Sequence, residues 1–124
     1  MKTRTINYRP RRHVKAYHAR KERWAVIVAH RRFGKTVAAI NDLIRDALTI
    51  QRENVRCAYI APYYRQAKAI AWDYLKEYTK DIDGVEINIA ELRIDFANGA
   101  RVRLFGADTY DALRGLYFDS VVLD

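Results

Sequence analysis

The stretch that decides the fold runs Trp24-Ala25-Val26-Ile27-Val28-Ala29-His30-Arg31-Arg32-Phe33-Gly34-Lys35-Thr36. Its first six residues, 24–29, form an unbroken apolar run, which is typical of a strand buried on both faces of a parallel sheet. Residues 37 to about 50 have helical period, with one apolar and one polar face. The apolar face holds Val37, Ile40, Ile44, Ala47 and Leu48, with Leu43 beside it, and Asn41, Asp42 and Arg45 are expected to face outward.

The loop Gly34-Lys35-Thr36, between this strand and this helix, carries the groups that bind a phosphate chain. Its amides and the helix N-terminus supply N–H donors, Lys35 can bridge the β- and γ-phosphates, and Thr36 can ligate Mg²⁺. We therefore expect a nucleoside triphosphate and Mg²⁺ as cofactors. Ala29 stands where the pattern G-x-x-x-x-G-K-[ST] has its first glycine, so a coincidental turn is the alternative. The candidate nucleotide-binding residues are Ala29, His30, Arg31, Arg32, Phe33, Gly34, Lys35 and Thr36. Arg31 and Arg32 are extra cations near the phosphates; the alternatives are a solvated pair or a contact to acidic groups elsewhere.

Further along, the pattern alternates between strands and helices. Residues 55–60 have the pattern of a second strand, closed by Ala61-Pro62. Alternating apolar residues on both sides of Asn98-Gly99 predict a β-hairpin at about 91–105, with a type I′ turn and positive φ at both turn residues. Residues 106–115 are expected to form a loop or short helix. A helix with its stripe in the core is predicted between the second strand and the hairpin, from Ala67, Ile70, Ala71, Tyr74, Leu75 and Tyr78.

The run Val121-Val122-Leu123-Asp124 has the form of a Walker B strand, in which a buried apolar strand ends at an acid. Asp124 is then expected to hold Mg²⁺, directly or through water. The order of strand, helix, strand, helix, hairpin insert and strand predicts an α/β architecture with a mostly parallel sheet.

Charge is concentrated at the start of the chain. The 124 residues carry a formal net charge of +8, and residues 1–36 hold 12 Lys and Arg against one acid, Glu22. Such a segment fits a polyanion partner, either nucleic acid or nucleotide phosphates, and a solvated basic arm is the alternative. No apolar run reaches the roughly 20 residues of a membrane-spanning helix. The lone Cys57, within an apolar run, is expected to be a buried small hydrophobe in a reducing compartment.

The chain resembles a known family over nearly its whole length: the large subunit (terminase ATPase) of tailed-bacteriophage DNA-packaging motors. Residues 30–36 look like the family's altered Walker A, in which an arginine three residues before the glycine, here Arg31, joins the lysine. Residues 59–68, followed by Trp72-Asp73, are similar to the segment after its second strand. Gly106-Ala107-Asp108, Leu113-Arg114-Gly115 and the terminal run 121–124 follow in the family's order, a combination that few other P-loop families show.

This resemblance implies a P-loop NTPase fold of the RecA/ASCE type, with ATP as the nucleotide, with Lys35, Asp124 and Arg114 as catalytic residues and with Thr36 and Asp124 at the metal. Arg114 looks like the family's candidate arginine finger, which would reach a neighbouring subunit's site; an Arg114 bonded to acids in its own loop is the alternative. The Tyr8-Arg9-Pro10 region would lie near the adenine. The implied partners are double-stranded DNA, the portal protein, the small terminase subunit and a homo-oligomeric ring, in the host cytoplasm and transiently at the procapsid portal, with no membrane.

The resemblance also implies that the chain is an N-terminal fragment. Residues 1–23 would be a basic segment and 24–124 an incomplete ATPase domain, truncated after the Walker B strand and without the nuclease domain. The family's water-orienting Glu would follow Asp124, so the fragment alone is expected not to hydrolyse ATP. In the implied strand order, a fourth strand would separate the strand at 24–29 from the Walker B strand. Another P-loop translocase or helicase ATPase, and a non-hydrolysing nucleotide- or DNA-binding fragment, are the alternative functions.

Overall fold

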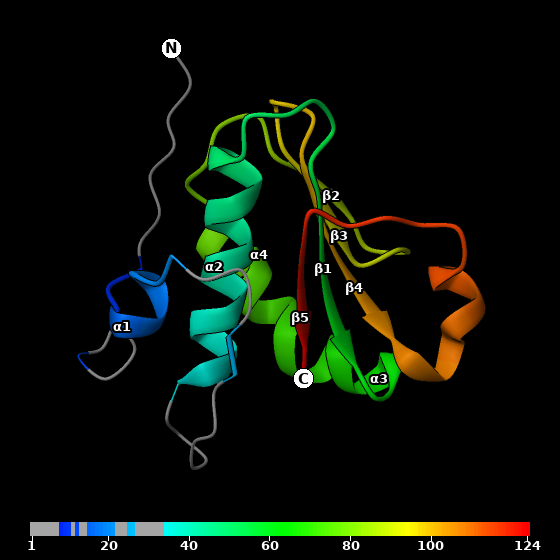
Figure 1. Cartoon of the computed structure of the whole chain (residues 1–124). Coiled ribbons are helices and arrows are strands. Elements are labelled where there is room, and N and C mark those ends of the chain that lie inside the picture. Colours follow the sequence, from blue (N-terminus) through cyan, green and yellow to red (C-terminus); the bar gives the residue numbers. More distant parts are fainter. Residues whose placement is uncertain (1–7, 11, 13–14, 22–24, 27–33) are drawn as a thin grey trace.

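The computed structural model of the chain forms one mixed α/β unit, in which a five-stranded sheet carries its long helices on one face (Figure 1). It describes residues 8–10, 12, 15–21, 25–26 and 34–124. The elements are α1 (Lys15–His18), α2 (Lys35–Thr49), β1 (Arg56–Ala61), α3 (Tyr64–Ala67), η2 (Lys68–Trp72), α4 (Asp73–Thr79), β2 (Glu86–Asn88), β3 (Arg93–Asp95), β4 (Arg101–Gly106), η3 (Ala107–Leu113) and β5 (Ser120–Leu123). Within the described ranges, no helix is both long and apolar enough to cross a membrane.

The strand order is β2-β3-β4-β1-β5, with β4, β1 and β5 parallel and with β2 and β3 antiparallel to their neighbours. The predicted α/β class, its parallel core and the hairpin insert are therefore confirmed. The three parallel strands all end at the same edge of the sheet, at Ala61, Gly106 and Leu123. This edge is where α/β folds build their ligand sites.

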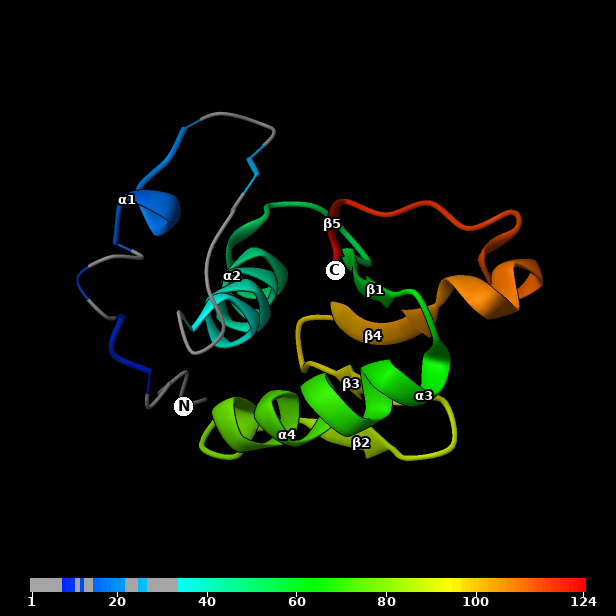
Figure 2. The same ribbon diagram turned by 90° about the horizontal axis from the view of Figure 1, so that it is seen from below.

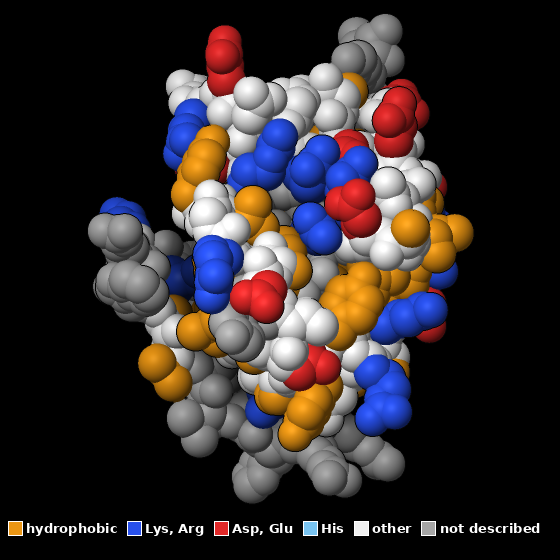
Figure 3. Space-filling view, turned by 90° about the vertical axis from the view of Figure 1, so that its right-hand side faces the viewer, with side chains coloured by type: hydrophobic (Ala, Val, Ile, Leu, Met, Phe, Trp, Pro, Cys, Tyr) orange, Lys and Arg blue, Asp and Glu red, His pale blue; other side chains and the backbone are white. Residues whose placement is uncertain are grey.

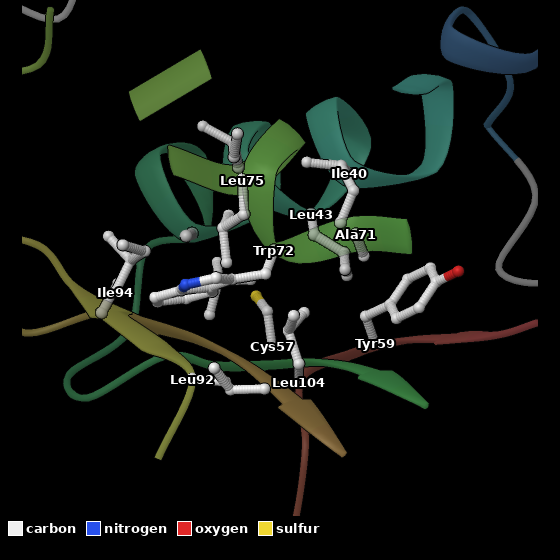
Figure 4. Close-up of a cluster of buried hydrophobic side chains, with 14 of the residues drawn as sticks. Ile40, Leu43, Cys57, Tyr59, Ala71, Trp72, Leu75, Leu92, Ile94 and Leu104 are labelled. Atoms are coloured by element: carbon white, nitrogen blue, oxygen red, sulfur yellow. The ribbon is translucent and has the colours of Figure 1, made fainter. Parts of the chain in front are cut away.

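The core lies between the sheet and two helical segments, α2 and the continuous run α3–η2–α4 (Figures 1 and 4). Ile40, Leu43 and Ile44 of α2 are fully buried, as the helical period predicts. Cys57 is buried among them, and burial raises the pKa of its thiol to about 12. The prediction that this cysteine is a buried small hydrophobe is confirmed.

The predicted stripe on the second helical segment is partly wrong. Ala67, Ala71 and Leu75 are buried as expected, but Ile70 is 44% exposed and Tyr74 is 41% exposed. The segment contains a π-helical turn, η2, whose wider winding favours a spacing of four or more residues over one of three. The buried stripe therefore runs 67, 71, 75 and 79 and includes the side chain of Trp72.

The hairpin turn also differs from the predicted type I′ geometry. Gly99 has a φ of 88°, but Asn98 is not in the left-handed region. The Gly99 amide donates to Phe96 O, so the loop is a turn centred on residues 97 and 98 that a left-handed glycine closes. The Asn98 side chain explains the difference, because its amide donates to Ala47 O of α2 and its oxygen accepts from the Ala100 amide.

The strand predicted at 24–29 lies mostly outside the described residues. Ala25 and Val26 are described and belong to no strand, and Val26 is 89% exposed. In the described part of the chain β5 pairs only with β1, so its outer edge carries no further strand. β5 is also not buried on both faces as predicted: Val121 is 44% exposed and Leu123 is 77% exposed, because the long helices cover only the other face of the sheet.

Candidate functional site

The start of α2 carries the described part of the predicted phosphate loop. Gly34 is the N-cap and has a φ of 87°, a left-handed conformation that favours glycine, and its carbonyl accepts the Ala38 amide at 2.9 Å. The first turn of α2 contains no acid, so no carboxylate competes for the positive end of the helix. Lys35 is exposed and Thr36 is half-buried. Ala29, His30, Arg31, Arg32 and Phe33 lie outside the described residues.

The predicted acid, Asp124, lies at the same edge of the sheet. Its amide donates to Ile60 O at 2.9 Å, which continues the parallel β1–β5 ladder by one residue. Its carboxylate accepts a hydrogen bond from the hydroxyl of Tyr59 on β1. Tyr59 is 1% exposed, and its hydroxyl points away from the apolar cluster in Figure 4.

Tyr59 connects the two predicted metal ligands. Burial and the carboxylate of Asp124 hold the pKa of Tyr59 far above its usual value, and a side-chain hydrogen bond with Thr36 opposes this shift. The single hydroxyl proton of Tyr59 is donated to Asp124, so the Tyr59 oxygen can only accept from the Thr36 hydroxyl. Sequence reasoning missed Tyr59; its signal was a phenol inside an otherwise apolar strand.

The residues at this edge fit Mg²⁺. Thr36 and Asp124 both interact with the Tyr59 hydroxyl, so the two side chains lie near each other. Both supply oxygen, the donor that Mg²⁺ prefers, and Mg²⁺ takes few protein ligands beside substrate phosphates and waters. Among the described residues, no group of three or more His, Cys, Asp or Glu side chains is placed to hold a metal. The described residues therefore contain no metal site built from three or more such side chains.

Arg114 lies in the segment that leads from β4 to β5. It follows η3, which is on the opposite side of the molecule from α2 in Figures 1 and 2. Its side chain is 74% exposed and pairs with Asp111 at 3.4 Å. This ion pair is the alternative given above for Arg114, a bond to an acid in its own loop. An ion pair between two exposed side chains contributes little stability.

Gly106, Asp108 and Asp119, on either side of Arg114 in the sequence, hold the ends of strands. Gly106 ends β4 directly against α3, where a Cβ would lie 2.1 Å from Tyr64 N. Asp108 accepts the Tyr64 amide at 2.9 Å, at the first turn of that helix, and its own amide donates to Pro62 O. Asp119 accepts the Arg56 amide at 2.9 Å and so fixes the segment before β5 to the start of β1.

A buried carboxylate ties the N-terminal segment to α2. Asp42 is 2% exposed, which corrects the prediction that it faces outward. It accepts hydrogen bonds from Tyr17 at 3.1 Å and Arg20 at 2.7 Å, and also pairs with Arg45. The polar face of α2 is buried because this segment covers it. Tyr8 packs at the same place, against His18 and Tyr78, and adenine binding by the Tyr8 region stays a prediction.

A second basic region, not predicted from the sequence, lies on the side shown in Figure 3. A cavity of about 330 Å³ there is lined by Arg56, Arg101, Arg103 and aromatic side chains. The arginines already have partners: Arg101 pairs with Asp95 at 2.6 Å, and Arg103 lies near Glu91 at 3.4 Å. Much of the positive charge of this face is therefore compensated.

Comparison with known proteins gives a structural likeness only. No family model matches the chain, and no curated protein matches it. The large terminase ATPase domain of Thermus phage P74-26 is similar, with a TM-score of 0.63 and 25% identity over 76% of this chain. The R139A mutant of that domain gives a TM-score of 0.55 and 23% identity over the same share. The chain spans 44% of the length of these structures, and it has a terminase-like ATPase fold of the P-loop NTPase kind.

Proposed function

We propose that the chain is the ATP-binding motor domain of a viral terminase large subunit, which drives packaging of double-stranded DNA into a procapsid. One observation carries the proposal: Thr36, in the first turn of α2, and Asp124, which follows β5, meet at the Tyr59 hydroxyl in a terminase-like ATPase fold. The carboxyl ends of parallel strands beside a helix N-terminus are the place where such folds bind nucleotide.

In this proposal the loop at 29–36 surrounds the triphosphate. The amides at the start of α2 donate to phosphate oxygens, and the exposed Lys35 places its ammonium against the β- and γ-phosphates. Thr36 and Asp124 hold the metal side of the nucleotide. Bound Mg²⁺ would neutralise charge on the phosphate oxygens during transfer to water. The ATPase domain is residues 24–124, preceded by the basic segment 1–23.

The remaining roles belong to an assembly. Arg114 is proposed to act on the ATP of a neighbouring subunit in a homo-oligomeric ring. Its exposed position, away from α2, is compatible with that role. Double-stranded DNA, the portal protein and the small terminase subunit are the proposed partners, in the host cytoplasm and at the procapsid portal. Part of the basic charge is already used within the fold, because Arg20 is paired with the buried Asp42.

The test is a nucleotide titration of the 124-residue chain with ATP and Mg²⁺. Lys35→Ala removes a charge-assisted contact worth about 1.5–3 kcal/mol, so its affinity is expected to fall roughly 10- to 150-fold. Lys68→Ala is the matched control, since it removes an exposed lysine from η2 without touching the loop. Equal affinities for the wild type and Lys35→Ala would contradict the proposal.

A further inference from the structure

Tyr59 has the environment of a core residue and the contacts of a site residue. It lies on the central strand β1 with 1% of its surface exposed, and its ring fills space beside α2 (Figure 4). A buried phenol needs a hydrogen-bond partner, and here the hydroxyl has two, from two other elements. Thr36 comes from α2, and Asp124 follows β5. A phenylalanine would fill the same space, so packing alone does not explain the hydroxyl.

We propose that Tyr59 is a positioning residue, whose hydroxyl holds Thr36 and Asp124 in the arrangement that receives a metal–triphosphate group. The inference rests on the proposed function. Mg²⁺ requires near-octahedral oxygen ligands, so two ligands from separate elements bind it well only if both are held in place. Groups that hydrogen-bond a metal's ligands typically change metal affinity 10- to 100-fold when they are removed.

The direction of the two hydrogen bonds suits this role. Thr36 donates its proton to Tyr59, which leaves its oxygen lone pairs available to a cation. Tyr59 donates to Oδ2 of Asp124, which orients the carboxylate. Each predicted metal ligand is therefore turned so that an acceptor oxygen can face the nucleotide.

The experiment compares the wild-type chain with Tyr59→Phe, which removes one oxygen atom from the core. A fluorescent ATP analogue is titrated in EDTA and again with Mg²⁺, and the gain in affinity that Mg²⁺ confers is the readout. Tyr78→Phe is the control, because it removes the hydroxyl of a partly buried tyrosine on α4, an element that holds neither predicted metal ligand. Tyr59→Phe is expected to lose roughly tenfold of the Mg²⁺ gain, with its affinity in EDTA unchanged. Tyr78→Phe should keep the full gain.

A double-mutant cycle with Asp124→Asn separates positioning from packing. If Tyr59 acts through Asp124, Tyr59→Phe has little further effect in the Asn background. An unchanged Mg²⁺ gain in Tyr59→Phe, or an equal loss in EDTA and in Mg²⁺, would overturn the role of Tyr59 while leaving the proposed function standing. No nucleotide binding by the wild type would overturn the proposed function and this inference with it.

Discussion

Replacing Gly106 with alanine should be among the most destabilising small changes in the chain. The new Cβ would lie 2.1 Å from Tyr64 N and 2.3 Å from Asp108 Oδ1. The nearest atom is backbone, so the end of β4 and the start of α3 must separate. The cost combines overpacking, about 1–3 kcal/mol, with the loss of the amide bond to Asp108, about 1.5–3 kcal/mol. We expect a total of about 3–5 kcal/mol, a large part of the stability of a small domain.

Urea unfolding followed by circular dichroism measures this loss, with Gly115→Ala as the matched control. Gly115 has a φ of 79° and no atom within 4 Å of its Cβ position, so alanine there meets only the left-handed backbone penalty, about 1–2 kcal/mol. Asp108→Ala removes the amide acceptor without adding an atom and should fall between the two. A Gly106→Ala loss no larger than that of Gly115→Ala would refute the close-contact reasoning.

Two further predictions concern Arg114 and His18. In the assembled protein, Arg114→Ala should bind ATP normally and lose turnover. Mixing this variant with Lys35→Ala should restore part of the turnover. If the two variants assemble together without any rescue of turnover, Arg114 does not act in trans. Burial lowers the pKa of His18, and the hydrogen bond to Asp42 opposes this shift. The neutral ring is thus favoured in the folded state, and stability should fall as the pH drops below about 6.5 toward the lower folded pKa. Thermal unfolding at pH 7.5 and 5.5 should show a smaller decrease for His18→Gln than for the wild type, and equal decreases would contradict the assignment.

Local pattern was enough for the elements whose neighbours are close in sequence. The apolar period of α2 identified Ile40, Leu43 and Ile44 as core, and the alternation around Gly99 located the hairpin. Pattern failed where a distant segment decides burial. Asp42 is buried because residues 17–20 cover it. Ile70 is a separate case, because the π-turn at η2 exposes a side chain that a regular helix would have buried.

The sequence was enough to predict which residues are candidate ligands, but not how they are arranged. Thr36 and Asp124 follow from a loop after a strand and an acid at a strand end, both of which are local signals. That a single hydroxyl lies between them depends on β1 pairing with β5 and on α2 packing over both, which is tertiary information. Tyr59 looks like any β-favouring aromatic until its neighbours are known.

Backbone amide NMR of the ¹⁵N-labelled chain tests triphosphate binding at Gly34-Lys35-Thr36 most directly. Adding ATP with Mg²⁺ should give the largest shifts at these three amides and at Asp124, because the amides donate to phosphate and the carboxylate faces the metal. The amides of Arg101 and Arg103, around the second basic region, should move little. Unmoved signals at 34–36 with large shifts at Arg101 and Arg103 would contradict nucleotide binding at the start of α2.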